Sequence, residues 1–136
     1  MLLVKTRLNI SKVHGIGLFA GEFIPKGTIT WKYSSEFDTS YPLDSIDRMS
    51  PSVRERFLDY SYVDFKQNKY ILCFDDQRFI NHSNKPNIKS TPDKDIALRN
   101  IKEGEEMTCN YEDYEKDWFE RRKIDKLSFR SISYKE

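Results

Sequence analysis

Closely spaced turn signals constrain this chain more than any other feature of its sequence. Pro and Gly stand together at 25–27, Gln67-Asn68 separates two apolar stretches, and Glu103-Gly104 precedes a third. Such residues favour turns, and turns between short apolar stretches are typical of a domain built from short strands. Only Ala20 and Ala97 represent the best helix former, against nine Phe and eight Tyr, which suit pleated surfaces. We therefore expect a mostly β (β-rich α+β) domain.

Short apolar or β-branched stretches between the turns predict the strands. Val4, Leu8 and Ile10 alternate with polar residues, which is typical of a half-buried strand. The other predicted strands are 28–33, a hairpin of 62–65 with 69–74, a pair formed by 88–90 and 96–100 on either side of a turn at 92–95, and 107–110.

Two short helices are expected among these strands. Ser50-Pro51 places a capping hydroxyl before a proline at the first helical position, so a helix is predicted over 51–60. Val53, Phe57 and Leu58 would form its apolar face. Asp113 is expected to cap a last helix that extends to about residue 123.

Size and charge exclude several classes of protein. The 136 residues suit one domain, and 23 basic against 22 acidic residues give a formal net charge of +1. This balance does not favour a nucleic-acid protein held by charge, and no apolar run is long enough to cross a membrane. Met1–Val4 reaches Lys5 too soon for a signal peptide. With only Cys73 and Cys109, we expect a reducing, intracellular location (cytoplasm or nucleus).

Three common kinds of site fit the sequence poorly. Gly15-Ile16-Gly17 begins a dinucleotide-like pattern, but Pro25 and nearby glycines leave no room for the helix that this motif requires. The two His and two Cys are not spaced in close pairs, so no metal site is expected. Nothing in the sequence activates either cysteine as a nucleophile. The glycines could still let the backbone approach a ligand, or they could form a turn without one.

A polar loop between two predicted strands carries the most specific signal. Arg78-Phe79-Ile80-Asn81-His82-Ser83 with Pro86-Asn87 resembles a signature of the SET-domain protein-lysine methyltransferases. Gly104–Tyr111 resembles their second signature, and His14–Ala20 their N-terminal Gly-x-Gly element. Three motifs in the family's order, across residues 13–111, are far more specific than any one alone.

The resemblance implies a fold and a cofactor. The fold would consist of several small curved sheets with a C-terminal knot-like crossing that brings Asn81 and His82 beside Tyr111. The cofactor would be S-adenosylmethionine, held by the His14–Leu18 backbone (His14, Gly15, Ile16, Gly17 and Leu18). The Asn81 side chain would bind its amino-acid end, and the His82 backbone would contact the adenine.

The resemblance also assigns the reaction. Tyr111 matches the catalytic tyrosine, which would orient a neutral lysine amine for attack on the methyl group of the sulfonium. Tyr33, Tyr70 and Cys109 are candidates for the lysine channel, although both tyrosines could be ordinary sheet aromatics. Many members carry Phe or Tyr at the position of Cys109, so a small residue suggests addition of more than one methyl group.

The sequence departs from the family pattern within the second signature. Asn110 stands where Asp is usual, and Met107 where Leu is usual. We expect a minimal stand-alone type of SET domain without a Cys-rich zinc segment, with a compact variable insert at about 36–66. A C-terminal helical lid at about 113–124 would then cover the cofactor, and Trp118 or Phe119 would stack on the adenine or simply pack on the sheet.

Three functions remain. The first is S-adenosylmethionine-dependent methyl transfer to a lysine of a protein substrate, without membrane or direct nucleic-acid binding. The second is a catalytically weak SET-like binding module that keeps the fold, with or without the cofactor site, and the third is a scaffold or interaction domain with no ligand. The sequence does not indicate the substrate, the number of methyl groups added or the oligomeric state.

Overall fold

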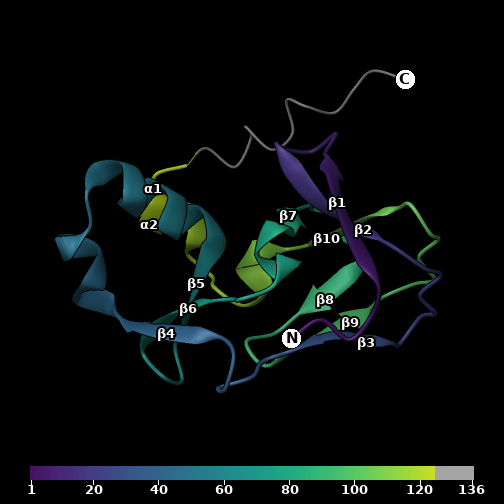
Figure 1. Cartoon of the computed structure of the whole chain (residues 1–136), viewed down its shortest axis with the longest axis horizontal. Helices are drawn as coiled ribbons and strands as arrows, with labels where there is room; N and C mark the ends of the chain where they lie inside the picture. Colours follow the sequence, from purple (N-terminus) through teal and green to yellow (C-terminus); the bar gives the residue numbers. More distant parts are fainter. Residues whose placement is uncertain (125–136) are drawn as a thin grey trace.

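The computed structural model describes residues 1–124, which form two sheets and short helices (Figure 1). The larger sheet has the order β1-β2-β10-β8-β9-β3, with β7 also paired to β10, and the smaller has the order β4-β6-β5. The strands are β1 (Thr6–Ile10), β2 (Ile16–Ala20), β3 (Ile29–Lys32), β4 (Thr39–Pro42), β5 (Ser61–Asp64), β6 (Lys69–Leu72), β7 (Asn81–His82), β8 (Ile88–Ser90), β9 (Lys94–Ala97) and β10 (Glu106–Cys109). The helices are α1 (Pro51–Tyr60), α2 (Trp118–Arg122) and the 3-10 helices η1 (Leu43–Arg48), η2 (Asp76–Phe79) and η3 (Tyr111–Asp113). The mostly-β prediction is confirmed.

Strand β10 lies at the centre of the larger sheet and determines where the polar loop sits. It runs antiparallel to β2 and parallel to both β7 and β8. Parallel neighbours need a long connection, so these pairings join segments that are distant in sequence. Thr108 pairs with Asn81, and Cys109 with His82. This pairing brings Asn81 and His82 beside Tyr111, as the resemblance predicted.

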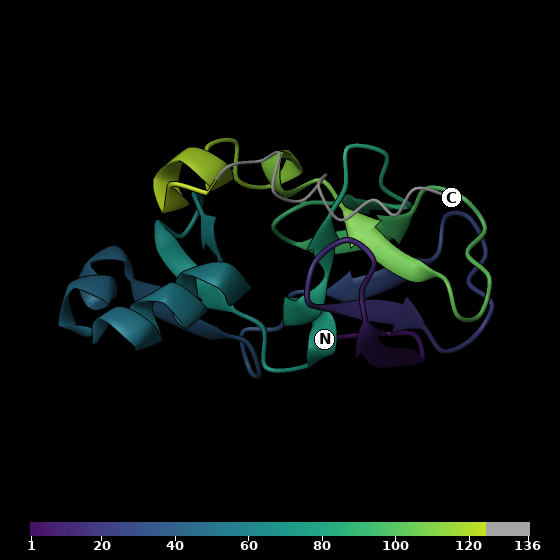
Figure 2. The ribbon, with the colours of Figure 1, turned by 90° about the horizontal axis from the view of Figure 1, so that it is seen from above.

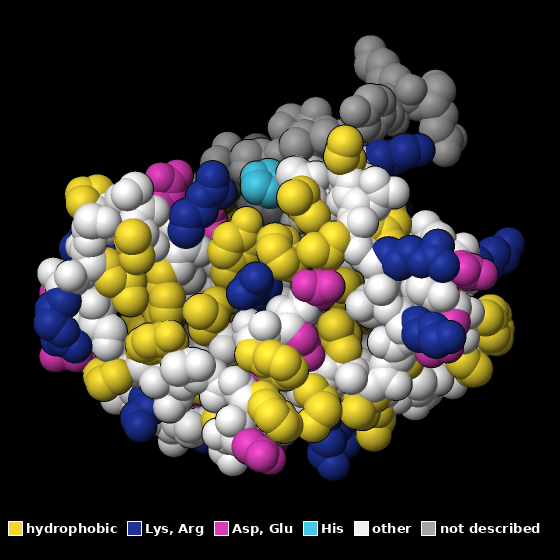
Figure 3. Space-filling model, viewed as in Figure 1, with side chains coloured by type: hydrophobic (Ala, Val, Ile, Leu, Met, Phe, Trp, Pro, Cys, Tyr) yellow, Lys and Arg dark blue, Asp and Glu magenta, His cyan; other side chains and the backbone are white. Residues whose placement is uncertain are grey.

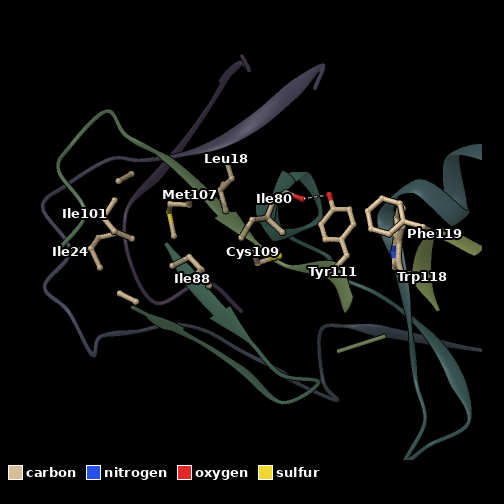
Figure 4. Packing of buried hydrophobic residues seen from close by; sticks show 12 residues of the cluster. Leu18, Ile24, Ile80, Ile88, Ile101, Met107, Cys109, Tyr111, Trp118 and Phe119 are labelled. Carbon is tan, nitrogen blue, oxygen red and sulfur yellow. Dashed lines mark hydrogen bonds between the residues drawn. The ribbon is translucent and has the colours of Figure 1, made fainter. Parts of the chain in front are cut away.

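The main core lies on one face of this sheet and ends in a row of aromatic rings. Leu18, Ile88, Ile101 and Met107 have no exposed surface. Tyr111 stands between this aliphatic core and the rings of Trp118 and Phe119 (Figure 4). The aromatic end of the core thus lies where β10 leaves the sheet.

The smaller sheet forms a second lobe together with α1 and α2 (Figures 1 and 2). Its own core is a small cluster of Phe57, Val63 and Tyr70. The predicted bounds of α1 and of the β5–β6 hairpin are confirmed within a few residues. The Ser50 side chain makes no capping hydrogen bond, however, and Val53 is exposed because only the C-terminal half of α1 packs on the lobe.

Other details differ from the predictions. Leu8 and Ile10 are exposed because β1 is an edge strand. The last helix begins at Trp118 and not at Asp113, since η3 and a turn occupy the residues before it. The predicted domain also includes residues 125–136, which lie outside the described residues. No helix among residues 1–124 is long and apolar enough to span a membrane.

Candidate active site

Tyr111 is held rigidly at the junction between β10 and η3. Its side chain is 6% exposed, and its hydroxyl donates to the Ile80 carbonyl oxygen at 2.6 Å (Figure 4). Its backbone N–H donates to His82 Nδ1 at 3.1 Å. Burial raises the pKa of Tyr111 well above its usual range, because charge is costly in a poorly solvated site. The phenol therefore stays neutral and acts as a hydrogen-bonding group rather than as a base.

The Asn81 amide holds the Gly-rich loop, residues 14–17, against the centre of the larger sheet. Its Nδ2 donates to the carbonyl oxygens of His14 at 2.9 Å and Ile16 at 3.3 Å, and to Glu106 Oε1 at 3.0 Å. These bonds hold the loop backbone in place from below. The amide nitrogen is thereby committed to the protein, which leaves Oδ1 as the side-chain atom with capacity for a ligand.

Glu106 explains why the loop needs a glycine at position 17. A Cβ built on Gly17 would stand 2.2 Å from Glu106 Oε1 and 3.0 Å from Ser11 Cβ. The same carboxylate oxygen accepts from Ser11 Oγ at 2.7 Å and from Asn81. Gly17 thus makes space for a carboxylate of the protein itself. Gly15 is different, because its φ is +48° and nothing lies within 4 Å of a built Cβ.

The surroundings of His82 point to a role in packing and positioning. Its ring packs edge-on against Phe119, with 4.9 Å between centroids, and lies 5.3 Å from the ring of Tyr111. Since Nδ1 accepts the Tyr111 N–H, the imidazole proton belongs on Nε2, which lies 3.2 Å from Asn84 Oδ1. The His82 side chain therefore orients Tyr111 by accepting its backbone N–H, and it is not placed as an acid or base.

Two cavities meet at Tyr111. The larger has a volume of about 230 Å³ and lies against the Gly-rich loop, Asn81, Phe79 and the last turn of α1. The smaller has a volume of about 40 Å³ and reaches toward Cys109. Both are lined by Asp59, Tyr60, Arg78, Ile80, Tyr111 and Trp118. A group bound in one cavity is therefore separated from a group in the other only by this shared wall.

The walls of the larger cavity suit a zwitterion with an attached ring. Arg56 and Arg78 supply positive charge, Asp59 supplies a carboxylate, and Trp118 and Phe79 supply aromatic surface. Burial raises the pKa of Asp59. Guanidinium groups bind carboxylates, carboxylates bind ammonium groups, and a flat apolar face accommodates a ring.

Aromatic side chains form much of the wall of the smaller cavity. Tyr62, Cys109 and Tyr114 line it together with Tyr111. Burial raises the pKa of the Cys109 thiol and of the Tyr114 hydroxyl well above their usual values, so both are neutral. A narrow cavity of this kind accepts the end of an extended aliphatic side chain.

A family model described as the SET domain matches residues 15–112. The chain belongs to the SET-domain family. Comparison with curated proteins found no match for the sequence.

Solved structures share the fold of this SET domain. A Plasmodium falciparum protein assigned as a histone methyltransferase is 22% identical with a TM-score of 0.57, over 81% of this chain and 95% of that one. A Chaetomium thermophilum polycomb repressive complex 2 bound to S-adenosylmethionine is 25% identical with a TM-score of 0.58, over 88% of this chain. An active polycomb repressive complex 2 is 26% identical with a TM-score of 0.62, over 79%. This chain spans less than a fifth of those polycomb chains (17% and 15%).

The SET-domain structure separates the predicted site residues into two groups. His14, Gly15, Ile16, Asn81, Tyr111 and Trp118 line the larger cavity, and Cys109 lines the smaller one. Leu18 lies in the core and Gly17 faces Glu106. His82 lines neither cavity. Tyr70 is buried in the second lobe's cluster, and Tyr33 lines neither cavity.

Trp118 and Phe119 play different parts in this SET domain. Trp118 lines both cavities, whereas Phe119 packs on His82 and Tyr111. The Arg122 guanidinium stacks over the Trp118 ring at 4.3 Å. Arg122 also donates to the fully buried Glu115 carboxylate at 2.8 Å and 3.2 Å, and Glu115 accepts the Val63 N–H at 2.9 Å. This ion pair fixes Trp118 against the second lobe.

The Asn110 substitution leaves the local hydrogen bonding intact. Its Oδ1 accepts the Glu112 N–H at 3.1 Å and caps η3. A carboxylate could accept the same bond, so the loss of charge at this position does not disturb Tyr111. Met107, the other departure, is fully buried in the core.

Sequence reasoning missed Glu106 and two residues of the larger cavity. Glu106 lines neither cavity but holds the loop through Asn81; it lies inside the second signature and could have been singled out there. Arg56 and Asp59 belong to the variable insert, whose sequence gives no sign that α1 reaches the site. Within residues 1–124, no three His, Cys, Asp or Glu side chains gather as a metal site.

Proposed function

We propose that this chain is an S-adenosylmethionine-dependent protein-lysine N-methyltransferase. The observation that supports this most directly is the pair of cavities with Tyr111 in their shared wall. One cavity has the size and charge to hold part of a zwitterionic cofactor, and the other is narrow and aromatic. Membership of the SET-domain family and the S-adenosylmethionine bound in a similar structure favour the same activity.

The residues of the larger cavity fit the cofactor. Gly15 leaves open space above the loop, Asp59 and Arg56 carry charges complementary to an amino-acid group, and Trp118 offers a ring face. Asn81 Oδ1 is a further acceptor for the amino-acid end. When bound, the cofactor supplies a methyl group activated by a positively charged sulfur.

The chain's own residues position the amine. The target lysine enters the smaller cavity as an extended side chain, and the buried wall disfavours its charged form. The Tyr111 hydroxyl, oriented by Ile80 and His82, directs the nitrogen lone pair toward the larger cavity. Alignment of two reactants in this way can account for much of the rate.

Cys109 is proposed to permit more than one methyl addition. It lies in the smaller cavity with no exposed surface, and a larger ring there would fill space that a methylated amine needs. Mass spectrometry should find di- or trimethyl product with the wild type and mainly monomethyl product with Cys109→Phe. Monomethyl product from both proteins would contradict this role.

A labelled-methyl assay on a cell lysate and on purified histones tests the proposal. The wild type should label lysine, and Tyr111→Phe should lower the transfer by about 100-fold or more, the range typical of lost positioning and hydrogen-bonding groups. Tyr41→Phe, a change in the second lobe's cluster, is the control and should keep full transfer.

Calorimetry separates methyl transfer from the alternative of a weakly catalytic binding module. Cofactor binding without transfer to any substrate would favour the module, and no cofactor binding would favour a scaffold. The partner under this proposal is a protein with a target lysine, in an intracellular compartment. Basic and acidic side chains are interspersed on the face shown in Figure 3, so substrate choice would depend on local grooves.

A further inference from the structure

The smaller cavity contains a buried carboxylate whose chemistry is still unassigned. Asp95 on β9 is 2% exposed and lines this cavity together with Cys109 and Tyr111. Its Oδ2 accepts from Gln77 Nε2 at 2.5 Å, and the Ser90 side chain also hydrogen-bonds to it. Among residues 1–124, no basic side chain pairs with it. A buried carboxylate without a cation is uncommon unless a ligand supplies one.

Two further polar atoms of the same cavity wall lack a partner. Gln77 Oε1 and Ser61 Oγ are buried and form no hydrogen bond, and their residues are 6% and 3% exposed. Buried polar side-chain atoms are nearly always hydrogen-bonded. Together with Asp95, these atoms make a wall rich in unused acceptors.

The chemistry of this wall selects a cationic amine. An ammonium group offers three donors and no acceptor, and a negative guest would be repelled by Asp95. A cavity of about 40 Å³ holds only a group of a few water-sized atoms. The aromatic surfaces of Tyr62, Tyr111 and Trp118 suit the methylene groups that precede such an ammonium.

We propose that Asp95 is a catalytic residue that accepts the proton of the target lysine before methyl transfer, a role that rests on the proposed function. An N–H bond of the ammonium breaks and an O–H bond forms on the carboxylate, so the lone pair stays on nitrogen. The nitrogen then bonds to the methyl carbon as the C–S bond breaks, and sulfur keeps that electron pair. The carboxyl proton passes to bulk water when the product leaves.

Burial of both partners favours this transfer. It raises the pKa of Asp95 to about 7, and it lowers that of a lysine from its ordinary value of about 10.4. In a poorly solvated cavity, the neutral acid and neutral amine are favoured over the charged pair.

The other titratable groups around Asp95 do not compete for this proton. Burial holds the pKa values of the Cys73 and Cys109 thiols and of the Tyr62, Tyr111 and Tyr114 hydroxyls above their usual ranges, so all five are neutral when Asp95 titrates. Tyr60 also lines the cavity, and the groups there that carry charge are Asp59 and Arg78.

Labelled-methyl transfer to purified histones and lysate, measured from near pH 7 to near pH 10, tests the role. Asp95→Asn should lower transfer about tenfold or more near pH 7, because a general base of this kind typically contributes at least that much. Near pH 10 the free lysine loses its own proton, so the variant should return to within about threefold of the wild type. Calorimetric cofactor binding should be equal in both.

Asp93→Asn is the matched control, because Asp93 is an exposed aspartate two residues away that pairs with Lys66. It should behave as the wild type at every pH. Asp95→Asn with full activity near pH 7, or with the same defect near pH 10, would overturn the proposal. Absence of transfer from the wild type would refute the proposed function instead.

A binding measurement on the wild type needs neither turnover nor a stable variant. n-Butylammonium is the end of a lysine side chain and stays charged up to about pH 10. It should bind about tenfold more tightly near pH 8, where Asp95 is ionised, than near pH 5, whereas uncharged n-butanol should bind equally at both. Equal n-butylammonium binding at the two pH values would contradict the assignment of Asp95.

Discussion

The two cavities beside Tyr111 are built from different materials. One wall of the larger cavity is the backbone of the Gly-rich loop, which the Asn81 and Glu106 side chains hold in place. The smaller cavity depends mainly on side chains, with tyrosines, a thiol and the Asp95 carboxylate in its wall. Variants should therefore affect the two cavities separately, except where a residue supports the wall that they share.

The strongest test removes the support of that shared wall. Glu115→Gln leaves Arg122 buried without its carboxylate, so the free energy of unfolding should fall by about 3–5 kcal/mol. Because Arg122 stacks on Trp118, both cavities should change together, and cofactor binding and transfer should both weaken. Denaturant unfolding measures the stability change. Glu120→Gln is the control, because Glu120 is exposed on α2, the helix that carries Arg122. An equal loss of stability in Glu120→Gln would contradict the role of the Glu115–Arg122 ion pair.

The second test affects only the smaller cavity, through pH. The folded pKa of Asp95 lies at about 7, above the unfolded value of 3.8. The protonated carboxyl is therefore favoured in the folded state, and its stability contribution is complete below about pH 4 and lost as the pH rises through about 7. Asp95→Asn should remove this loss, so the variant should gain a few kcal/mol relative to the wild type between pH 4 and pH 8. If the stability difference between Asp95→Asn and the wild type stayed constant with pH, the raised pKa of Asp95 would be contradicted.

The third test affects only the larger cavity. Gly17→Ala would push a Cβ into the Glu106 carboxylate and disturb its bonds to Ser11 and Asn81. The expected loss is about 1–3 kcal/mol, as for other overpacked sites. The double variant Gly17→Ala with Glu106→Ala should lose less than the sum of the two single changes. Additive losses, measured by denaturant unfolding, would show that the two residues do not interact.

The smallest effect is expected at the other glycine of the loop. Gly15→Ala meets no neighbour but must keep φ at +48°, so it should cost about 1 kcal/mol. It should also weaken cofactor binding slightly, measured by calorimetry. A loss as large as that of Gly17→Ala would mean that backbone strain, and not the position of Glu106, explains both glycines.

Local sequence signals predicted the parts of the fold that depend on neighbours in the chain. The Ser50-Pro51 pair predicted where α1 begins, and Gln67-Asn68 predicted the β5–β6 hairpin. Asp95 shows the limit of such signals. Its polar neighbours favoured a turn at 92–95, yet pairing with β3 draws it into β9 and buries it. Burial of that kind depends on a strand more than sixty residues away, which no local pattern contains.

The sequence motifs predicted the central residues of the candidate site, but not most of the residues that surround them. The two signatures identified Asn81 and Tyr111 as neighbours, and the hydrogen bond from Tyr111 to His82 agrees. Tyr70 fits a channel aromatic equally well by sequence, but β6 carries it into the second lobe. Glu106 lies inside the second signature, whereas the contributions of Asp59 and Asp95 arise from tertiary packing alone.

The position of β10 has a consequence for how an emerging polypeptide acquires its site. β10 is the shared partner of β2, β7 and β8, although among residues 1–124 it is the last strand in chain order. Until it inserts, Asn81 lacks the Glu106 oxygen and His82 lacks the Tyr111 N–H. Trp118, which lines both cavities, follows later still. Such non-local pairings form slowly, so during synthesis the proposed enzyme would stay inactive until nearly all the described residues had left the ribosome.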